Sequence, residues 1–323
     1  MKKYSDLYQI ISQEIKLTQY AETPTELYEP ISYMMSLGGK RLRPVLVLMA
    51  CQMFDADVSK ALNAAHAIEV FHNFTLVHDD IMDNAPLRRG QQTVYTKWNM
   101  PIAILSGDLM MIKATQLLCK TESNQLKSLL EIFNKAAIEV CEGQQIDMNF
   151  ETRNDVSHDE YINMIGLKTS VLLAASLQIG AKIGGASDED AQYLYDFGKN
   201  MGIAFQIQDD ILDSFGEGDK VGKKIGGDIV SNKKTLLLIE LLEACNKDDK
   251  KFVTENLLFE SDIDKKINGM LHLYKKYQVK EFAENMKNKY MNLAFASLEV
   301  VNTINEAKLI LKHTAQELMT RMS

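Results

Sequence analysis

The 323 residues include ordinary shares of hydrophobic (46%) and charged (25%) side chains, so the chain can bury a large core without disulfides or structural metals. A formal net charge of −8 argues against a nucleic-acid-binding protein, which would carry a basic surface. The N-terminal stretch lacks the apolar segment of a signal peptide, and no apolar run reaches the ~18 residues of a membrane span. Without paired spacing, the four cysteines are expected to be inert thiols in a cytoplasmic protein.

Apolar residues recur at helical spacing along most of the chain, and the last of the five prolines is Pro101. Alternating β-branched residues are scarce, so we predict an all-α protein with almost no sheet. In chain order, helices are predicted over residues 3–19, 25–36, 41–54, 58–82, 101–119, 123–149, 158–182, 188–213, 231–246, 248–257, 261–278 and 280–319. No shift in composition marks a domain boundary, which favours one domain spanning residues 1–323.

A glycine-rich run extends from Ser214 to Asp228, between two of these helices. It contains five glycines and three lysines, too many glycines for a helix and too much charge for a core. We interpret it as a mobile functional loop.

One rare acidic pattern occurs twice, as Asp-Asp-Ile-Met-Asp at 79–83 and as Asp-Asp-Ile-Leu-Asp at 209–213. Each copy ends a predicted helix, on which the first and third carboxylates share a face and the second flanks them. A single copy is equally well explained as a solvated helix end. Two copies, each followed by a basic segment, indicate a cation site, because hard ions such as Mg²⁺ take carboxylate oxygens together with water and substrate phosphates.

Basic residues occur near both acidic motifs. They are found in the segment Gly-Gly-Lys-Arg-Leu-Arg-Pro at 38–44, at Arg88 and Arg89 after the first motif, at Lys168 within an apolar helix, and around the glycine-rich run. Arginine binds phosphoryl oxygens in a bidentate manner and lysine binds them as a point charge. The acids and bases together therefore predict a site for a diphosphate.

Five segments in this order, GGKRLRP, HDDIMDNAPLRRG, Lys168-Thr169, FQIQDDILD and GKKIGGDIVSNKKT, resemble those of the trans-isoprenyl diphosphate synthases, or polyprenyl synthetases. The resemblance covers residues 30 to 240. It implies a single-domain isoprenoid-synthase-type helical bundle around a deep central cavity, usually a homodimer. The implied reaction is Mg²⁺-assisted condensation of isopentenyl diphosphate with an allylic diphosphate (dimethylallyl, geranyl or farnesyl).

The resemblance also assigns residues. It implies three Mg²⁺ ions held by Asp79, Asp83 and Asp209, with Asp80, Asp210 and Asp213 supporting them or binding water. The isopentenyl diphosphate positions are Lys40, Arg43, His72 and Arg89, and the allylic diphosphate positions are Arg88, Lys168, Thr169, Gln206, Lys223 and Lys233. The implied catalytic residues are Asp79, Asp80, Asp83, Asp209, Asp210 and Lys168. A hydrogen-bonding role in the core is an alternative for His72, and His66 and His78 are interpreted as structural.

Product length in this family depends on the residues beneath the first acidic motif. Phe74 lies five residues and Thr75 four residues before Asp79. A single aromatic at the fifth position resembles geranylgeranyl diphosphate synthases, with a farnesyl or longer product as the alternative. Met110 and Met111 are further candidates for the cavity floor, although their simpler interpretation is core packing.

Three other functions fit the sequence less well. A class I terpene cyclase needs no isopentenyl diphosphate site and normally has a different second metal motif. A non-catalytic partner subunit usually loses acids from one motif, whereas this chain retains all six. A generic acidic metal-binding helical protein would not explain the cations.

Overall fold

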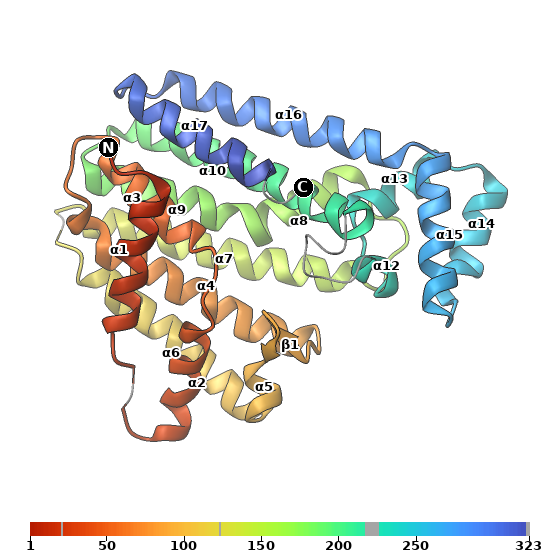
Figure 1. Ribbon diagram of the computed structural model, residues 1–323, viewed down its shortest axis with the longest axis horizontal. Helices are drawn as coiled ribbons and strands as arrows, with labels where there is room; N and C mark the ends of the chain where they lie inside the picture. The colour runs from red at the N-terminus through yellow and green to blue at the C-terminus, as the bar shows by residue number, and fades with distance from the viewer. Residues whose placement is uncertain (21, 123, 217–225, 321–323) are drawn as a thin grey trace. The chain divides into compact units, whose positions relative to one another are not determined.

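The computed structural model describes residues 1–20, 22–122, 124–216 and 226–320, and helices make up most of them (Figure 1). Within these ranges the strands are two residues each, β1 (Leu87–Arg88) and β2 (Gln91–Gln92), paired antiparallel. The prediction of an all-α protein is therefore confirmed.

Contacts between residues divide the chain into two units. The first comprises Met1–Lys135, Ala175–Tyr195 and Asn302–Lys308, and the second Ala136–Ala174, Asp196–Val301 and Leu309–Ser323. The single domain over 1–323 stays a prediction.

The first unit places the first acidic motif at the end of a core helix. Its helices are α1 (Tyr4–Leu17), α2 (Thr25–Ser36), α3 (Leu42–Gln52), a 3₁₀ turn (Val58–Ala61), α4 (Leu62–Met82), α5 (Val94–Lys97) and α6 (Met100–Cys119). Almost every residue of α3 is buried, as expected of a helix that is apolar on all sides. The long helix α4 packs along α6 (Figure 1).

The second unit has a core of aliphatic side chains built around α13. Its helices are α8 (His158–Ile165), a π-helical turn (Gly166–Ser170), α12 (Gly227–Val230), α13 (Leu236–Ala244), α14 (Lys247–Glu255), a 3₁₀ turn (Leu257–Phe259), α15 (Ile263–Lys276) and α16 (Val279–Val300). Four further helices contribute residues to both units: α7 (Leu126–Phe150), α9 (Val171–Gly184), α10 (Asp188–Phe215) and α17 (Asn305–Thr320).

Some predicted helix boundaries were wrong, and local hydrogen bonds explain why. The single helix predicted over 280–319 is interrupted after Val300, where the backbone N–H of Asn302 donates to Asp190 Oδ1 at 2.6 Å instead of to a helical carbonyl. The helix predicted from residue 231 begins at Leu236, because the Thr235 hydroxyl accepts from the N–H of Leu238. The short helices α5 and α12 and the β1–β2 hairpin were not predicted.

The glycine-rich run differs in part from its predicted extent. Helix α10 continues to Phe215 and α12 begins at Gly227, so helices occupy both ends of the run. The structure does not describe residues 217–225, which include Lys223. The predicted mobility of this loop and the predicted role of Lys223 therefore stay predictions.

Among the described residues, two helical stretches, 158–184 and α6, are long and apolar enough to cross a membrane, contrary to the sequence-based expectation. Of the most apolar part of residues 158–184, 78% is buried, as is usual for a core helix. The corresponding share for α6 is only 33%, so this helix presents apolar side chains at the surface. Length and composition are weak grounds for a span, and its absence stays a prediction.

Candidate active site

The first acidic motif occupies the last turn of α4, and its neighbouring aspartates have different surroundings. Asp79 is partly exposed and Asp83 exposed, whereas Asp80 is 1% exposed. Arg88, on β1, donates from Nε to Asp80 Oδ1 at 2.8 Å, and its Nη2 forms ion pairs with Asp80 Oδ1 at 2.8 Å and with Asp79 Oδ2 at 3.5 Å. Burial raises the pKa of Asp80, and Arg88 opposes this shift by favouring the carboxylate.

The Gly-Gly-Lys-Arg segment is a turn anchored by a buried ion pair. Its backbone passes through positive φ at Gly38, Gly39 and Arg41, and Arg41 precedes the first residue of α3. The Arg41 guanidinium donates to the Glu69 carboxylate and, at 2.9 Å, to the Met35 carbonyl. The pairing of Arg41 was not predicted, and it holds the turn that presents the exposed Lys40.

Beside this turn lie the side chains of Arg43 and Arg89, and one N–H group of Arg43 is buried without a partner among the described residues. The Arg89 guanidinium donates to the Gly38 carbonyl and lies so close to Gly39 that a Cβ there would be 2.8 Å from Arg89 Nη2. Arg43 donates to His72 Nε2 at 3.1 Å, while Arg43 Nε is buried without a partner among the described residues. Burial, followed by the Arg43 and Arg89 charges, holds the pKa of His72 well below its usual value, so the imidazole is neutral and accepts. These contacts favour a bound polyanion.

The second acidic motif, on α10, repeats the contrast seen in the first. Asp209 is partly exposed, whereas Asp210 is buried and both its oxygens accept hydrogen bonds. Tyr161 of α8 donates to Oδ2, and Gln206 Nε2 donates to Oδ1 at 3.1 Å. Burial raises the pKa of Asp210 to about 7, and these two donors oppose the rise.

The third aspartate of this motif positions α12. Asp213 Oδ2 accepts from the backbone N–H of Asp228 at 2.9 Å, and the Asp213 carbonyl accepts from Gly226 at 2.7 Å. Lys233 is exposed, with Nζ 3.9 Å from Asp228 Oδ1. The chain on the far side of the glycine-rich run is therefore tied back to the acidic motif.

Lys168 and Thr169 lie in the π-helical turn, a local widening often found at functional sites. Lys168 Nζ lies 2.6 Å from Asp147 Oδ2 of α7, and the Thr169 hydroxyl donates to Gln206 Oε1 at 3.2 Å. Helix α7 approaches the turn at Gly143, where an added Cβ would be 2.3 Å from the Lys168 nitrogen. Asp147 was not predicted. No local sequence signal marks it, since its partner Lys168 lies 21 positions away.

The predicted chain-length residues occupy the preceding turns of α4. Phe74 is buried, and its ring packs against Phe71 (5.4 Å between centroids) and His78 (4.9 Å). Thr75 is partly exposed and its hydroxyl donates to the His72 carbonyl at 2.8 Å.

The other side chains weighed from the sequence divide between core and surface. Met110 is fully buried, as expected for a core methionine, whereas Met111 is exposed, so its assignment to the core was wrong. His66 is buried and hydrogen-bonded to the Tyr20 hydroxyl, which supports a structural role.

A family model for polyprenyl synthetases matches residues 24–273. The chain belongs to the polyprenyl synthetase family. The geranylgeranyl diphosphate synthase of Sulfolobus acidocaldarius is 40% identical to this polyprenyl synthetase over 304 residues, which cover 93% of this chain and 92% of that protein. The geranylgeranyl diphosphate synthase of Methanosarcina mazei is 44% identical over 222 residues, 68% of each chain. A crystal structure of a geranylgeranyl pyrophosphate synthase matches with a TM-score of 0.94 and 41% identity, covering 100% of both chains.

The donors in this polyprenyl synthetase suit a hard divalent ion. Within the described ranges, no three His, Cys, Asp or Glu side chains gather into a preformed metal cluster. Mg²⁺ is commonly bound by one or two carboxylates, with water and substrate phosphates completing its shell. The accessible aspartates Asp79 and Asp83, one turn apart, fit that mode of binding.

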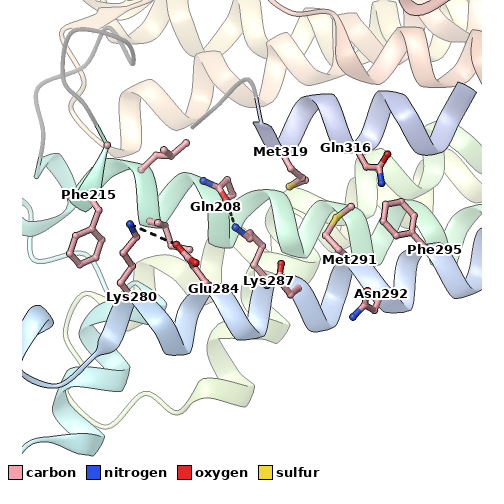
Figure 2. A pocket seen from close by; sticks show the side chains of 14 residues that line it. Gln208, Phe215, Lys280, Glu284, Lys287, Met291, Asn292, Phe295, Gln316 and Met319 are labelled. Atoms are coloured by element: carbon pink, nitrogen blue, oxygen red, sulfur yellow. Dashed lines mark hydrogen bonds and ion pairs between the residues drawn. The ribbon is translucent and has the colours of Figure 1, made fainter.

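The second unit of the polyprenyl synthetase has a pocket of about 960 Å³ (Figure 2). This pocket is lined by α10, α16 and α17, and Lys287 donates to Gln208 at its wall at 2.7 Å. The lining residues of α10 are Gln208, Ile211, Leu212 and Phe215, which lie on a different side of the helix from Asp209 and Asp213. No predicted site residue lines this pocket.

Proposed function

We propose that this polyprenyl synthetase condenses isopentenyl diphosphate with an allylic diphosphate and releases geranylgeranyl diphosphate. The observation that carries the proposal is the group formed by Arg43, His72 and Arg89, with the buried Arg43 Nε unpaired. A terpene cyclase ionises one allylic diphosphate and has no use for a second diphosphate site of this kind. The product is proposed from the two relatives described above, both named as geranylgeranyl diphosphate synthases.

The reaction requires no protein nucleophile. The C–O bond of the allylic diphosphate breaks, and its electron pair leaves with the diphosphate. The double bond of isopentenyl diphosphate then forms the new C–C bond to the allylic carbon, which leaves a cation on the isopentenyl unit. A neighbouring C–H bond breaks, its electron pair forms the new double bond, and the proton passes to the departed diphosphate. Arg88, Lys168, Thr169, Gln206 and Lys233 would hold the leaving group, where preorganised donors stabilise the developing charge. Lys40, Arg43 and Arg89 would hold the second substrate.

Magnesium is proposed as the cofactor, with three ions per active site. Asp79, Asp83 and Asp209 would hold them, and the bound ions would supply neutralisation of the leaving diphosphate. The support from the structure is that these aspartates are at least partly exposed, whereas Asp80 is buried with Arg88 donating to Oδ1, and Asp210 is buried with a donor on each oxygen.

A homodimer is proposed on the evidence of α6. Five apolar side chains of this helix are 41% to 59% exposed and recur on one side of it: Met100, Ile104, Leu105, Met111 and Ile112. Asp108 lies among them, with Oδ1 3.9 Å from His78 Nε2. Large exposed apolar patches commonly mark protein interfaces. A second copy of the chain would cover this one.

A cytoplasmic location is also proposed. The four cysteines are free thiols, as is usual for proteins of a reducing compartment.

The proposed reaction is tested by incubating the purified protein with isopentenyl diphosphate, each allylic primer in turn and Mg²⁺, then measuring the mass of the product. Geranylgeranyl diphosphate is expected, and Asp209→Ala should abolish its formation while retaining the helical circular dichroism spectrum. The control is Asp188→Ala, which removes an exposed aspartate from the first turn of the same helix. Normal turnover by Asp209→Ala would contradict the mechanism, and a farnesyl or longer product would contradict the product assignment.

A further inference from the structure

A buried tyrosine hydroxyl holds the second aspartate of the α10 motif. Tyr161 is 2% exposed and donates to Asp210 Oδ2, while Gln206 Nε2 donates to Oδ1 at 3.1 Å. The carboxylate is therefore held between α8 and α10 with a donor on each oxygen. No acidic motif or phosphate-binding segment includes Tyr161.

This carboxylate dictates the orientation of an amide. Both oxygens of Asp210 accept hydrogen bonds, one from Tyr161 and one from Gln206, so Gln206 turns its NH₂ group toward Asp210. The Gln206 carbonyl oxygen then faces the Thr169 hydroxyl, which donates to it at 3.2 Å. The second N–H of the same amide has the donor polarity that a phosphoryl oxygen requires. An inverted amide would present its oxygen to the diphosphate and repel it.

We infer that Tyr161 is a positioning residue for the allylic diphosphate: its hydroxyl fixes Asp210, and Asp210 fixes the amide of Gln206 with its N–H groups toward the ligand. The inference rests on the proposed function, in which Gln206 contacts that diphosphate. The first motif has a parallel arrangement, because buried Asp80 holds the guanidinium of Arg88. In each motif the second aspartate thus orients a donor of the proposed allylic site.

The test measures binding of geranyl thiolodiphosphate, an analogue that resists ionisation, by calorimetry in the presence of Mg²⁺. Tyr161→Phe is expected to weaken binding roughly tenfold, the scale of one hydrogen bond to a charged group. The KM for the allylic substrate should rise by a similar factor, and the KM for isopentenyl diphosphate should stay unchanged. In a Gln206→Ala background, Tyr161→Phe should cause no further loss of binding, since its effect is transmitted through that amide.

Tyr274→Phe is the matched control, because Tyr274 is equally buried in the same core cluster but is hydrogen-bonded to Thr235. It should bind the analogue like the unmodified protein. Failure of the unmodified protein to bind would refute the proposed function, whereas unchanged binding by Tyr161→Phe would refute only this inference. An equal loss in the Gln206→Ala background would also overturn it. Asp210→Asn keeps the shape of the side chain but no longer dictates the orientation of the Gln206 amide. If this variant bound the analogue as tightly as the unmodified protein, the inference would be overturned, even if Tyr161→Phe did not fold.

Discussion

At the residue scale, the first two aspartates of each motif have different surroundings: the first is partly exposed, and the second is buried and holds a neighbouring donor. Neighbouring positions on a helix point ~100° apart, so Asp79 can remain accessible while Asp80 is buried against Arg88. The sequence predicts that these carboxylates belong to one site. It cannot predict which of them turns inward, because that depends on which side of α4 is covered by the rest of the fold. For the same reason Tyr161 gave no signal in the sequence, since its partner Asp210 lies 49 positions away.

Phe74 is predicted to limit product length. Replacing it with alanine removes a ring that packs against Phe71 and His78, so Phe74→Ala should yield a longer prenyl chain, with a loss of unfolding free energy of about 3 kcal/mol. Thr75→Phe adds an aromatic ring one position nearer to Asp79 and should shorten the product. Mass spectrometry of the products measures both effects. The same product from both variants would place the floor elsewhere, with Met110 the next position to test.

His66 should make the protein sensitive to acid. Burial lowers the pKa of His66 to about 4, against 6.5 for the free side chain, so the folded state binds fewer protons than the unfolded state between these values. Its contribution to stability is present above pH 6.5 and is lost as the pH falls to about 4, a change on the order of 3 kcal/mol.

Urea unfolding at several pH values measures this effect. The unfolding free energy of His66→Asn should fall less steeply between pH 6.5 and 4 than that of the unmodified protein. His313→Asn removes an exposed histidine and serves as the control. Parallel curves for the unmodified protein and His66→Asn would show that His66 does not carry the acid sensitivity.

At the scale of elements, the sequence predicted helices well where a cap or a long apolar repeat marks them. Ser157 and Glu160 form a capping box at the start of α8, and that helix was predicted to start at residue 158, as observed. The break between α16 and α17 was not predicted, because it is set by contacts of Asn302 and Thr303 with Asp190 and Met53. Such long-range bonds leave no periodic signal in the local sequence.

For the π-helical turn, the sequence predicted candidate functional residues but not the backbone geometry that positions them. The family resemblance pointed to Lys168 and Thr169, but not to the widened turn that carries them, which α7 approaches closely at Gly143. Gly143→Ala would place a methyl group 2.3 Å from the Lys168 nitrogen, so the turn must move. We expect kcat to fall at least tenfold, the scale of misplacing one binding group.

Gly166→Ala is the matched control for this prediction. It adds the same methyl group within the same turn, where no atom lies within 4 Å of the added Cβ. Steady-state kinetics of the two variants measure the effect. A near-normal kcat in Gly143→Ala would mean that the position of the turn is unimportant for catalysis.

At the scale of the whole molecule, the charges around His72 differ in sign from the net charge of the protein. The chain carries a net charge of −8, yet Arg41, Arg43, Arg88 and Arg89 contribute to the electrostatic surroundings of His72. Because Arg41 and Arg88 are paired with Glu69 and Asp80, it is Arg43 and Arg89 that indicate a local anionic ligand, and they do so better than net charge does. Composition argues against nucleic acid as the partner, but only the motifs point to diphosphates.

The apolar side of α6 is the whole-molecule feature that predicts assembly. Leu105 and Ile112 are 59% and 52% exposed, and covering them with a second copy would remove apolar surface from water. Leu105→Asp or Ile112→Asp would bury a charge in that interface, so each should raise the dimer Kd by roughly thirtyfold or more, about 2 kcal/mol. Light scattering at decreasing concentration measures the change.

Leu309→Asp puts the same charge on an exposed leucine of α17 and should leave the dimer intact. A monomeric unmodified protein, or α6 variants that dimerise as tightly as Leu309→Asp, would show that this side of α6 serves another purpose.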